Sequence, residues 1–252
     1  VSGALVASST AQFDTIGVGA AKDLGIGIHV KESDSGAGVN ANADHVVIEA
    51  NGNAGMSILT ATGSAGKIAF GDSGDSEIGK ILYDHSNNSM QVYTNANQAM
   101  NIDAAGHVTK PLQPAFSASS GTQNNMAVGA YVDIIYSNEV FDNNADYNNS
   151  NYTFTAPVTG KYHLSFFVNL IAVDTAGMNY TWFTIDTSNR DYRADIINSG
   201  IGEADLAIHG FGGTVVADMD ASDTAKITFY QDGGTAQADV DGNSYFTGYL
   251  LG

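Results

Sequence analysis

Short segments of alternating apolar and polar residues, separated by turn-forming residues, run along the whole chain. The clearest segment places Tyr162, Leu164, Phe166 and Val168 on one face of a strand. Gly, Asn and Asp clusters end such segments, as they do between β-strands. The first half of the chain holds no helical window of useful length. The pattern therefore predicts an all-β protein.

Residues 1–110 carry short predicted strands in a chain rich in Gly, Ala, Ser and Asn. The dipeptide Asn51-Gly52 is typical of a type I′ hairpin turn. The segments resemble one another only loosely and share no fixed period, so a regular solenoid is not indicated. The predicted strands cover residues 25–30, 45–49, 56–60, 67–70 and 90–94.

Residues 111–252 carry more predicted strands, with turns between them. Strands with this spacing indicate a β-sandwich or a jelly roll. They cover residues 152–154, 162–168, 180–186, 214–217, 226–231 and 245–250.

The aromatic residues divide unequally between the two halves. Residues 1–110 hold four of them and residues 111–252 hold the other twenty. Because large aromatic side chains dominate cores, we expect the second half to fold around its own core. The first half is expected to form a Gly-rich β-stalk that gains buried area by trimerising. Pro111 and Pro114 mark the predicted boundary, with a stalk in residues 1–110 and a knob in residues 111–252.

Residues 112–252 resemble the globular C1q and tumour necrosis factor-like family. The resemblance opens with Pro-Ala-Phe-Ser-Ala at residues 114–118, continues through Tyr162 and Phe166, and closes with Tyr-Phe-Thr-Gly-Tyr-Leu-Leu at residues 245–251. It implies a ten-stranded jelly roll that assembles as a tight homotrimer. No collagen repeat precedes the domain, so a different stalk is expected to hold the trimer together.

Residues 17–108 resemble a segment of marine phage tail fibres and related virion proteins. The similarity is strongest at residues 66–75, 83–90 and 99–103. In many such fibres this segment leads into a self-cleaving chaperone domain, whose place the C1q-like knob takes here. The resemblance implies a virion fibre protein.

Charge and cysteine content restrict the function classes. The chain has 9 basic and 27 acidic residues, for a net charge of −18, which repels phosphate backbones and anionic membranes. No apolar run approaches the ~18 residues of a membrane span. We therefore expect neither nucleic-acid binding nor membrane insertion. The absence of cysteine favours assembly in a reducing cytosol, here the host cytoplasm, before the protein becomes part of the virion.

No catalytic constellation is recognisable, so the protein is expected not to be an enzyme. Residues 71–75, Gly-Asp-Ser-Gly-Asp, superficially match the nucleophile loop of trypsin-like proteases. A triad also needs a His base and a buried Asp, and no His has a matching context. Asp75 also stands where that motif has its next Gly, so a turn is the expected structure. A polysaccharide depolymerase is disfavoured because no carboxylate pair is identifiable.

No cofactor is expected, with calcium as the open alternative. Asp239 and Asp241 lie in a segment that hints at a calcium loop, but Gly242 comes too early and no bidentate Glu follows. An Asp-Gly turn before the last strand is the favoured interpretation. Some C1q-like trimers bind calcium near the apex, so Asp239 and Asp241 stand as metal candidates.

Receptor contact is expected on loops of the knob, in residues 174–179, 187–193 and 232–241, because loops on a rigid scaffold carry recognition. Arg190 and Arg193 beside Tyr192 are candidates for gripping an acidic sugar or a phosphate, and Tyr180 for an exposed contact. The alternative is that both arginines neutralise nearby carboxylates.

The other aromatic residues of the knob are expected in its core or in a trimer interface. They are Tyr152, Phe154, Tyr162, Phe166, Trp182, Phe183, Phe229, Tyr245, Phe246 and Tyr249.

The predicted function is that of a phage tail fibre whose trimeric knob binds a host surface glycan or outer-membrane protein, in contact with other virion proteins. Three copies would raise avidity ~10²–10⁴-fold without new contacts. Two alternatives remain open at this point: a capsid head fibre, and a purely structural trimerisation module without receptor binding.

Overall fold

The structure, a computed structural model, describes residues 16–19, 28–198 and 204–251. The chain divides into two compact units, Val1–Lys67 and Ile68–Gly252. Every regular element in the described residues is a β-strand, which confirms the all-β prediction. No helix there is long and apolar enough to cross a membrane.

The first unit contains a small parallel sheet. Its strands are β1 (Ile16–Gly19), β2 (Ile28–Lys31) and β3 (Val46–Glu49), paired side by side in that order. The strand predicted at residues 45–49 overlaps β3. The strand predicted at residues 25–30 overlaps β2 at residues 28–30, and its residues 25–27 lie outside the described residues. The prediction of a strand at residues 56–60 was wrong, because that segment is irregular and exposed. The prediction of a hairpin turn at Asn51-Gly52 was also wrong, because no strand follows β3 until residue 65.

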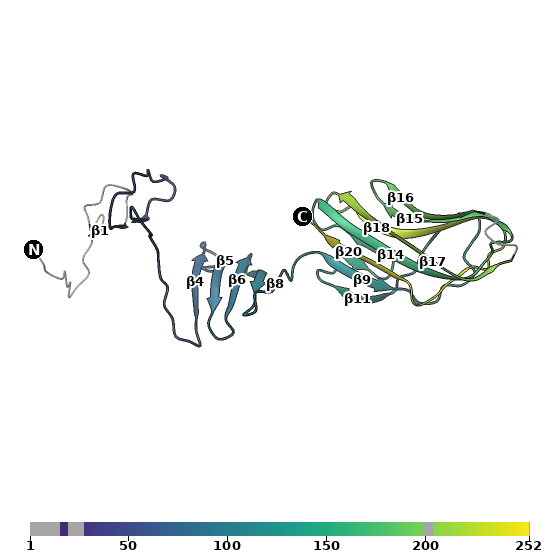
Figure 1. Ribbon diagram of the computed structural model, residues 1–252, viewed down its shortest axis with the longest axis horizontal. Coiled ribbons are helices and arrows are strands. Elements are labelled where there is room, and N and C mark those ends of the chain that lie inside the picture. Colours follow the sequence, from purple (N-terminus) through teal and green to yellow (C-terminus); the bar gives the residue numbers. More distant parts are fainter. Residues whose placement is uncertain (1–15, 20–27, 199–203, 252) are drawn as a thin grey trace, which may run out of the picture. The chain divides into compact units, whose positions relative to one another are not determined.

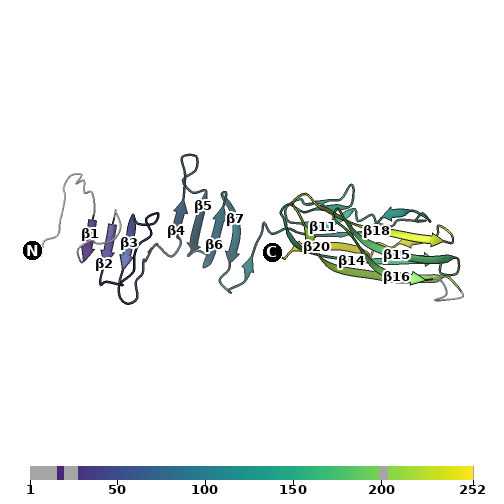
Figure 2. The same ribbon diagram turned by 90° about the horizontal axis from the view of Figure 1, so that it is seen from above.

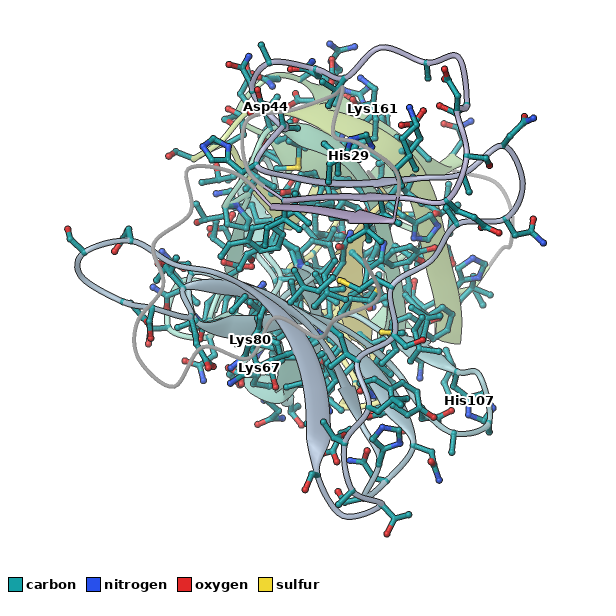
Figure 3. The ribbon with its side chains drawn as sticks, turned by 90° about the vertical axis from the view of Figure 1, so that its left-hand side faces the viewer. His29, Asp44, Lys67, Lys80, His107 and Lys161 are labelled. Carbon is teal, nitrogen blue, oxygen red and sulfur yellow. The ribbon has the colours of Figure 1, made fainter. Side chains whose placement is uncertain are left out.

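In this unit the usual arrangement of side chains on β2 and β3 is reversed, with apolar side chains exposed and polar side chains buried. The apolar residues Ile28, Val30, Val46 and Ile48 are exposed, while polar side chains alternate with them on the buried face. On that face the Nε2 atom of His29 lies 2.9 Å from a carboxylate oxygen of Glu49. Figure 3 labels His29. An exposed apolar strip on a small sheet is typical of a surface that another chain covers.

The Glu49 carboxylate is the centre of the buried polar face. Its other oxygen accepts hydrogen bonds from the backbone N–H and the hydroxyl of Ser35, at 2.8 and 3.0 Å. The Lys31 ammonium lies 3.5 Å from the Glu49 oxygen that His29 contacts. These donors outweigh burial and lower the pKa of Glu49 to about 2.

A five-stranded sheet follows, formed by β4 (Ala65–Phe70), β5 (Gly79–Asp84), β6 (Ser89–Thr94), β7 (Asn97–Ile102) and β8 (Val108–Thr109) in that order. Figure 2 shows β4 to β7 side by side. β5 to β8 pair antiparallel. The predicted strands at 67–70 and 90–94 are confirmed as parts of β4 and β6, whereas β5 and β7 were not foreseen.

The knob is a sandwich of two six-stranded sheets. One, the β14 sheet, has the order β11 (Asn138–Asp142), β9 (Ala115–Ser119), β20 (Tyr245–Leu250), β14 (Gly160–Val173) and β17 (Leu206–Met219), with β19 (Asp239–Val240) also paired to β14.

The other, the β18 sheet, has the order β12 (Tyr147–Asn148), β13 (Thr153–Thr155), β18 (Thr224–Gly233), β15 (Met178–Thr187) and β16 (Asp191–Asn198), with β10 (Tyr131–Asp133) also paired to β18. Figure 1 shows the two layers. This is the jelly roll that the sequence predicts, with the short β10 and β19 added to the ten expected strands.

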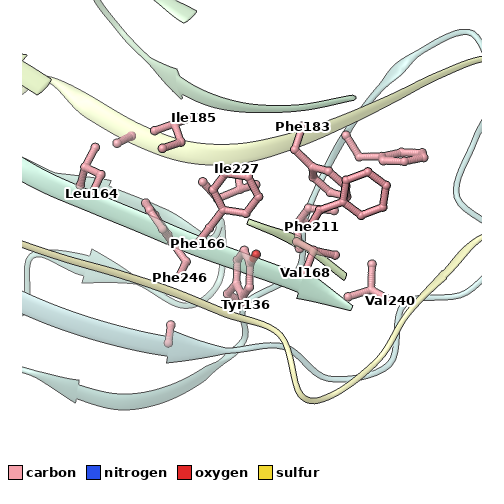
Figure 4. Packing of buried hydrophobic residues seen from close by; sticks show 14 of the residues in the cluster. Tyr136, Leu164, Phe166, Val168, Phe183, Ile185, Phe211, Ile227, Val240 and Phe246 are labelled. Atoms are coloured by element: carbon pink, nitrogen blue, oxygen red, sulfur yellow. The ribbon is translucent and has the colours of Figure 1, made fainter. Parts of the chain in front are cut away.

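Alternate residues of the long strands fill the space between the two sheets. Figure 4 shows Phe166, Phe183, Phe211 and Ile227 packed together there. The predicted core aromatics Phe154, Tyr162, Phe166, Phe183, Phe229 and Phe246 are all buried. Packing is tight enough that a Cβ atom at Gly248 would lie 2.7 Å from side-chain carbons of both Leu164 and Phe116.

The chain is fastened to the knob just before β9. The Asn144 side-chain amide donates to the Leu112 carbonyl at 3.0 Å, and the Leu250 backbone N–H donates to the Pro114 carbonyl at 3.0 Å. These bonds tie the segment next to the two prolines to the knob. A stalk–knob boundary at residue 110 stays a prediction.

Candidate functional site

The outward face of the β14 sheet, the apolar face, carries several exposed apolar side chains. Ile208, Val216, Tyr245 and Tyr249 are exposed on it, and Val216 is 54% exposed. The Phe167 ring stacks on Tyr245 with centroids 5.9 Å apart. Contiguous apolar side chains on the surface of one chain mark a contact with another protein surface.

Small residues in β17 let the Phe167 ring lie flat against the sheet. A Cβ atom at Gly210 would lie 2.9 Å from that ring, so glycine is the residue that fits there. His163 lies on the same face, with its ring 5.0 Å from that of Tyr249 and its Nε2 2.9 Å from the Thr214 hydroxyl. The face therefore combines apolar side chains with the polar pair His163 and Thr214.

The outward face of the β18 sheet carries a row of aromatic rings, the aromatic ladder, formed by Tyr180, Trp182, Tyr230 and Tyr131. Tyr180 and Trp182 stack 4.9 Å apart at 8°, and Trp182 and Tyr230 stack 4.7 Å apart at 20°. Tyr131 ends the ladder, tilted 43° to Tyr230 at 5.1 Å. Such stacks hold each ring in one orientation.

Arg193 completes the aromatic ladder on β16. Its guanidinium carbon lies 3.8 Å from the centre of the Trp182 ring, a short cation–π contact. The Trp182 Nε1 atom is buried and has no hydrogen-bond partner among the residues the structure describes. The two-residue period of β15 explains the placement, because Phe183 points into the core and Trp182 points away from it.

A polar depression adjoins the Tyr131 end of the ladder. This outer pocket has a volume of about 370 Å³. Pairing of β10, β18, β15 and β16 brings its residues together, since Asp133 lies opposite Thr228, Thr228 opposite Thr184, and Lys226 opposite Asp186. Its lining consists of Tyr131, Asp133, Thr184, Asp186, Asp191, Lys226 and Thr228.

The outer pocket holds three carboxylates and one ammonium group. The Lys226 Nζ atom lies 2.8 Å from an Asp133 oxygen and 4.0 Å from an Asp186 oxygen. Burial raises the pKa of Asp186, Lys226 opposes that rise, and the neighbouring Asp191 carboxylate adds to it. The pocket is therefore acidic in balance.

Two threonines form the most buried part of the pocket lining. Thr184 is 3% exposed and Thr228 is 4% exposed. Both side chains line the pocket beside its three carboxylates and the Lys226 ammonium group. A hydroxyl can both donate and accept, so these two groups are available to a ligand.

The predicted receptor residues do not gather at one place on the β18 sheet. Arg193 and Tyr180 flank Trp182 on the outward face. Tyr192 packs against the core, with the Arg190 guanidinium carbon 6.0 Å from its ring centre. The structure therefore does not bring Arg190 and Arg193 together as a two-arginine grip.

Trp182, Tyr230 and Tyr131 were missed as site residues. Trp182 was expected in the core or in a trimer interface. Its ring faces away from the core beside Arg193, and a position in an interface stays a prediction. The alternation of Trp182 with Phe183 along the strand was the sequence signal that the two rings lie on opposite faces. Tyr131 had no sequence signal, because only the pairing of β10 with β18 places it there.

Two of the predicted receptor loops are locked together by one buried carboxylate. Asp174 accepts hydrogen bonds from the Thr235 hydroxyl at 2.6 Å and from the Gly177 backbone N–H at 2.8 Å. These bonds, the Thr235 contacts first, lower the pKa of Asp174. The carboxylate thus joins loop 174–179 to loop 232–241.

The metal candidates Asp239 and Asp241 are engaged with amide groups. Asp239 accepts from the Asn125 backbone N–H at 2.7 Å, and Asp241 from the side chains of Asn243 and Asn169 at 2.7 and 3.1 Å. In the described part of the chain no group of three or more His, Cys, Asp or Glu residues is arranged to hold a metal ion.

Residues 71–75 form the turn that the sequence suggests. The Asp72 carboxylate accepts from the backbone N–H groups of Gly74 and Asp75, at 2.7 and 3.0 Å. Those bonds lower the pKa of Asp72. The acid thus stabilises a local turn.

Comparison with known proteins identifies the domain. The sequence model of the C1q domain family matches residues 115–251. Similar solved structures are the globular domain of zebrafish complement 1qA (16% identity, 56% of this chain, 98% of that chain, TM-score 0.40) and murine APRIL at pH 5.0 (10%, 55%, 99%, 0.39). No curated protein matches. C1q domains are known for trimeric assembly and ligand binding. With more than half of its length matched by that family, this chain belongs to the C1q domain family.

Proposed function

We propose that this chain is the homotrimeric fibre protein of a phage tail, and that its C1q knob attaches the virion to a host-cell surface molecule. The observation that carries the proposal is the outer pocket beside the aromatic ladder. It lies on the sheet opposite the apolar face, where a trimer would leave it open to solvent.

The apolar face of the β14 sheet supports the trimeric assembly. Burying Val216, Tyr245 and Tyr249 between copies would remove their apolar area from water, the main driving force of association. Three outer pockets would then face outward around one axis. Weak single contacts would combine, raising avidity by ~10²–10⁴-fold.

The first unit supports a stalk that trimerises as well. Its exposed strip of Ile28, Val30, Val46 and Ile48 is apolar, and the buried face carries Glu49 instead. A copy of the same strip is the simplest cover for it. The resemblance of residues 17–108 to phage tail fibres supports placing this stalk in a virion assembled in the host cytoplasm.

The proposed role is recognition without catalysis. C1q and tumour necrosis factor-like domains are generally non-enzymatic binding modules. The outer pocket offers hydrogen-bond acceptors, hydroxyls and one exposed ring, which suit binding. The net charge of −18 makes phosphate-rich partners unfavourable.

A cell-binding assay tests the proposal. The fluorescently labelled full chain is added to a panel of bacterial strains, and its mass is measured by light scattering. We expect a particle of three 26.2 kDa chains that binds some strains, and markedly weaker binding by Tyr131→Ala at unchanged mass. Tyr131→Phe, which keeps the ring, is the matched control. Binding to no strain, or equal binding by Tyr131→Ala, would contradict the proposal.

A further inference from the structure

We infer that the outer pocket binds an uncharged, hydroxyl-rich sugar residue of a host surface glycan. The inference rests on the proposed function and gives its ligand a chemical class. Residues from four strands build the pocket, and they supply three features together: an aromatic wall, two threonine hydroxyls and a surplus of carboxylates.

The aromatic wall is Tyr131. Its side chain is 56% exposed, whereas the rings of Tyr180, Trp182 and Tyr230 are stacked on one another. The Tyr230 contact at 5.1 Å supports the Tyr131 ring from the ladder side. A pyranose ring has an apolar C–H face, and a flat aromatic ring is its natural packing partner. Tyr131 is therefore the surface on which the sugar ring lies.

The hydrogen-bonding groups of the pocket match hydroxyls. Carboxylates such as Asp133 and Asp191 can only accept, Lys226 can only donate, and the hydroxyls of Thr184 and Thr228 do both. A sugar hydroxyl also donates and accepts, so each of these groups finds a partner on a polyol. An apolar ligand would leave the threonine hydroxyls unsatisfied.

The charges of the pocket exclude anionic sugars. Asp133 already pairs with Lys226, and Asp186 and Asp191 face each other across β15 and β16. Arg193 is held against the Trp182 ring. A uronic or sialic acid would add a fourth carboxylate to this site, without a free cation among the described pocket residues to pair with it. A neutral sugar meets no such repulsion.

Size agrees with this ligand. The volume of about 370 Å³ lies at the low end of the ~300–1,000 Å³ typical of small-molecule sites. The pocket therefore suits one or two sugar rings at a chain end rather than a long buried oligosaccharide.

Tryptophan fluorescence reports on the aromatic ladder beside the pocket, because Trp182 is the single tryptophan of the chain and stacks on Tyr230, which contacts Tyr131. The intact trimer is titrated with methyl glycosides of glucose, galactose, mannose and N-acetylglucosamine, and in parallel with glucuronic and N-acetylneuraminic acids. We expect at least one neutral glycoside to change Trp182 emission with a Kd in the millimolar range, about 1 mM. The acidic sugars are expected to bind at least about tenfold more weakly.

Variants separate the features of the pocket. Tyr131→Ala is expected to weaken sugar binding roughly tenfold, and Tyr131→Phe to retain it. Asp191→Asn is expected to reduce the discrimination against the acidic sugars. Asp220→Asn removes the same charge from an exposed loop acid outside the pocket, and is expected to change neither. Tighter binding of an acidic sugar, no response to any neutral glycoside, or unchanged binding by Tyr131→Ala would overturn the inference.

Competition on cells distinguishes this inference from the proposed function. If Tyr131→Ala abolishes cell binding but neutral glycosides neither compete nor change the fluorescence, the ligand is not a neutral sugar and the attachment role stands. If glycosides bind the pocket but the trimer adheres to no cells, the attachment role fails and the sugar site stands.

Discussion

The guanidinium carbon of Arg193 lies 3.8 Å from the centre of the Trp182 ring, on the face of the β18 sheet that points away from the core. The contact joins β16 to β15 outside the sandwich, next to the stacks with Tyr180 and Tyr230. The contact places the guanidinium over the Trp182 ring, and that ring stacks on Tyr230, which in turn contacts Tyr131.

Arg193→Ala is expected to loosen the ladder. Loss of a cation–π contact at a partly exposed site costs about 0.5–1 kcal/mol of folding free energy. Trp182 also becomes more hydrated, so its emission maximum is expected to move to longer wavelength. Arg190→Ala is the matched control, because Arg190 lies near Tyr192 instead, and it should leave the emission maximum in place. Equal spectra for Arg193→Ala and the wild type would contradict the contact.

Val216→Asp is expected to abolish trimer formation. The substitution places a charge on the face that the proposed trimer buries, and an unpaired buried carboxylate is strongly unfavourable. Light scattering at micromolar concentration should then give a mass near 26.2 kDa. Val158→Asp makes the same change at an exposed valine between β13 and β14, and should leave the trimer intact. A trimer of Val216→Asp would show that this face is not the interface.

Asp174 is expected to make the folding stability of the knob fall at low pH. Its pKa in the folded chain is lowered from the ordinary 3.8, so its carboxylate stabilises the fold fully above that value. As the pH falls through the lower folded pKa, the group is protonated and this stabilisation is lost. Thermal melts at pH 7 and at steps below pH 4 would measure the fall in Tm.

Replacing Asp174 separates its contribution from those of other acids. Asp174→Asn is expected to cost about 1–3 kcal/mol at pH 7, because it weakens hydrogen bonds to a charged acceptor. The difference in Tm between the variant and the wild type should shrink as the pH falls below 4. A difference that stays constant down to pH 2 would show that the Asp174 charge has no part in stability.

The two halves are expected to differ as isolated fragments. Residues 112–252 contain the complete buried cluster that begins at Phe116, so this fragment should melt cooperatively and trimerise alone. Residues 1–110 have exposed apolar strands and should give no cooperative melt as a monomer. Circular dichroism on each fragment measures both. A cooperative melt of monomeric 1–110 would show that the stalk folds without partners.

The core of the knob was predictable, but the faces of its strands were predictable only in part. Phe166 and Phe183 follow the two-residue period of β14 and β15, and both are buried as expected. Trp182 follows the same period on the other face of β15, so period alone leaves open whether an aromatic residue faces the core or solvent. The outer pocket is lined by residues of β10, β18, β15 and β16. The alternation of residue types within a strand does not predict which distant strands pair with one another.

The first unit shows a different limit. Alternation in residues 28–31 correctly indicates a strand, but hydrophobicity suggests that Ile28 and Val30 are inside and His29 is outside. In the single chain the reverse holds, because Glu49 and Ser35 satisfy the polar face. Which face is buried depends on what covers the apolar strip, and sequence patterns describe one chain at a time.

Cysteine labelling measures most directly which knob face is exposed in the intact protein, because the chain contains no cysteine of its own. Val216→Cys and Tyr131→Cys place one thiol on each face, at positions that are 54% and 56% exposed in the single chain. The rate of reaction with a maleimide is measured for each intact protein and again after dilution or mild denaturant dissociates it. The account predicts fast labelling at position 131 throughout and slow labelling at position 216 until the subunits separate. Equal rates in the intact protein, or protection at position 131 instead, would contradict a trimer that buries the β14 sheet and presents the outer pocket.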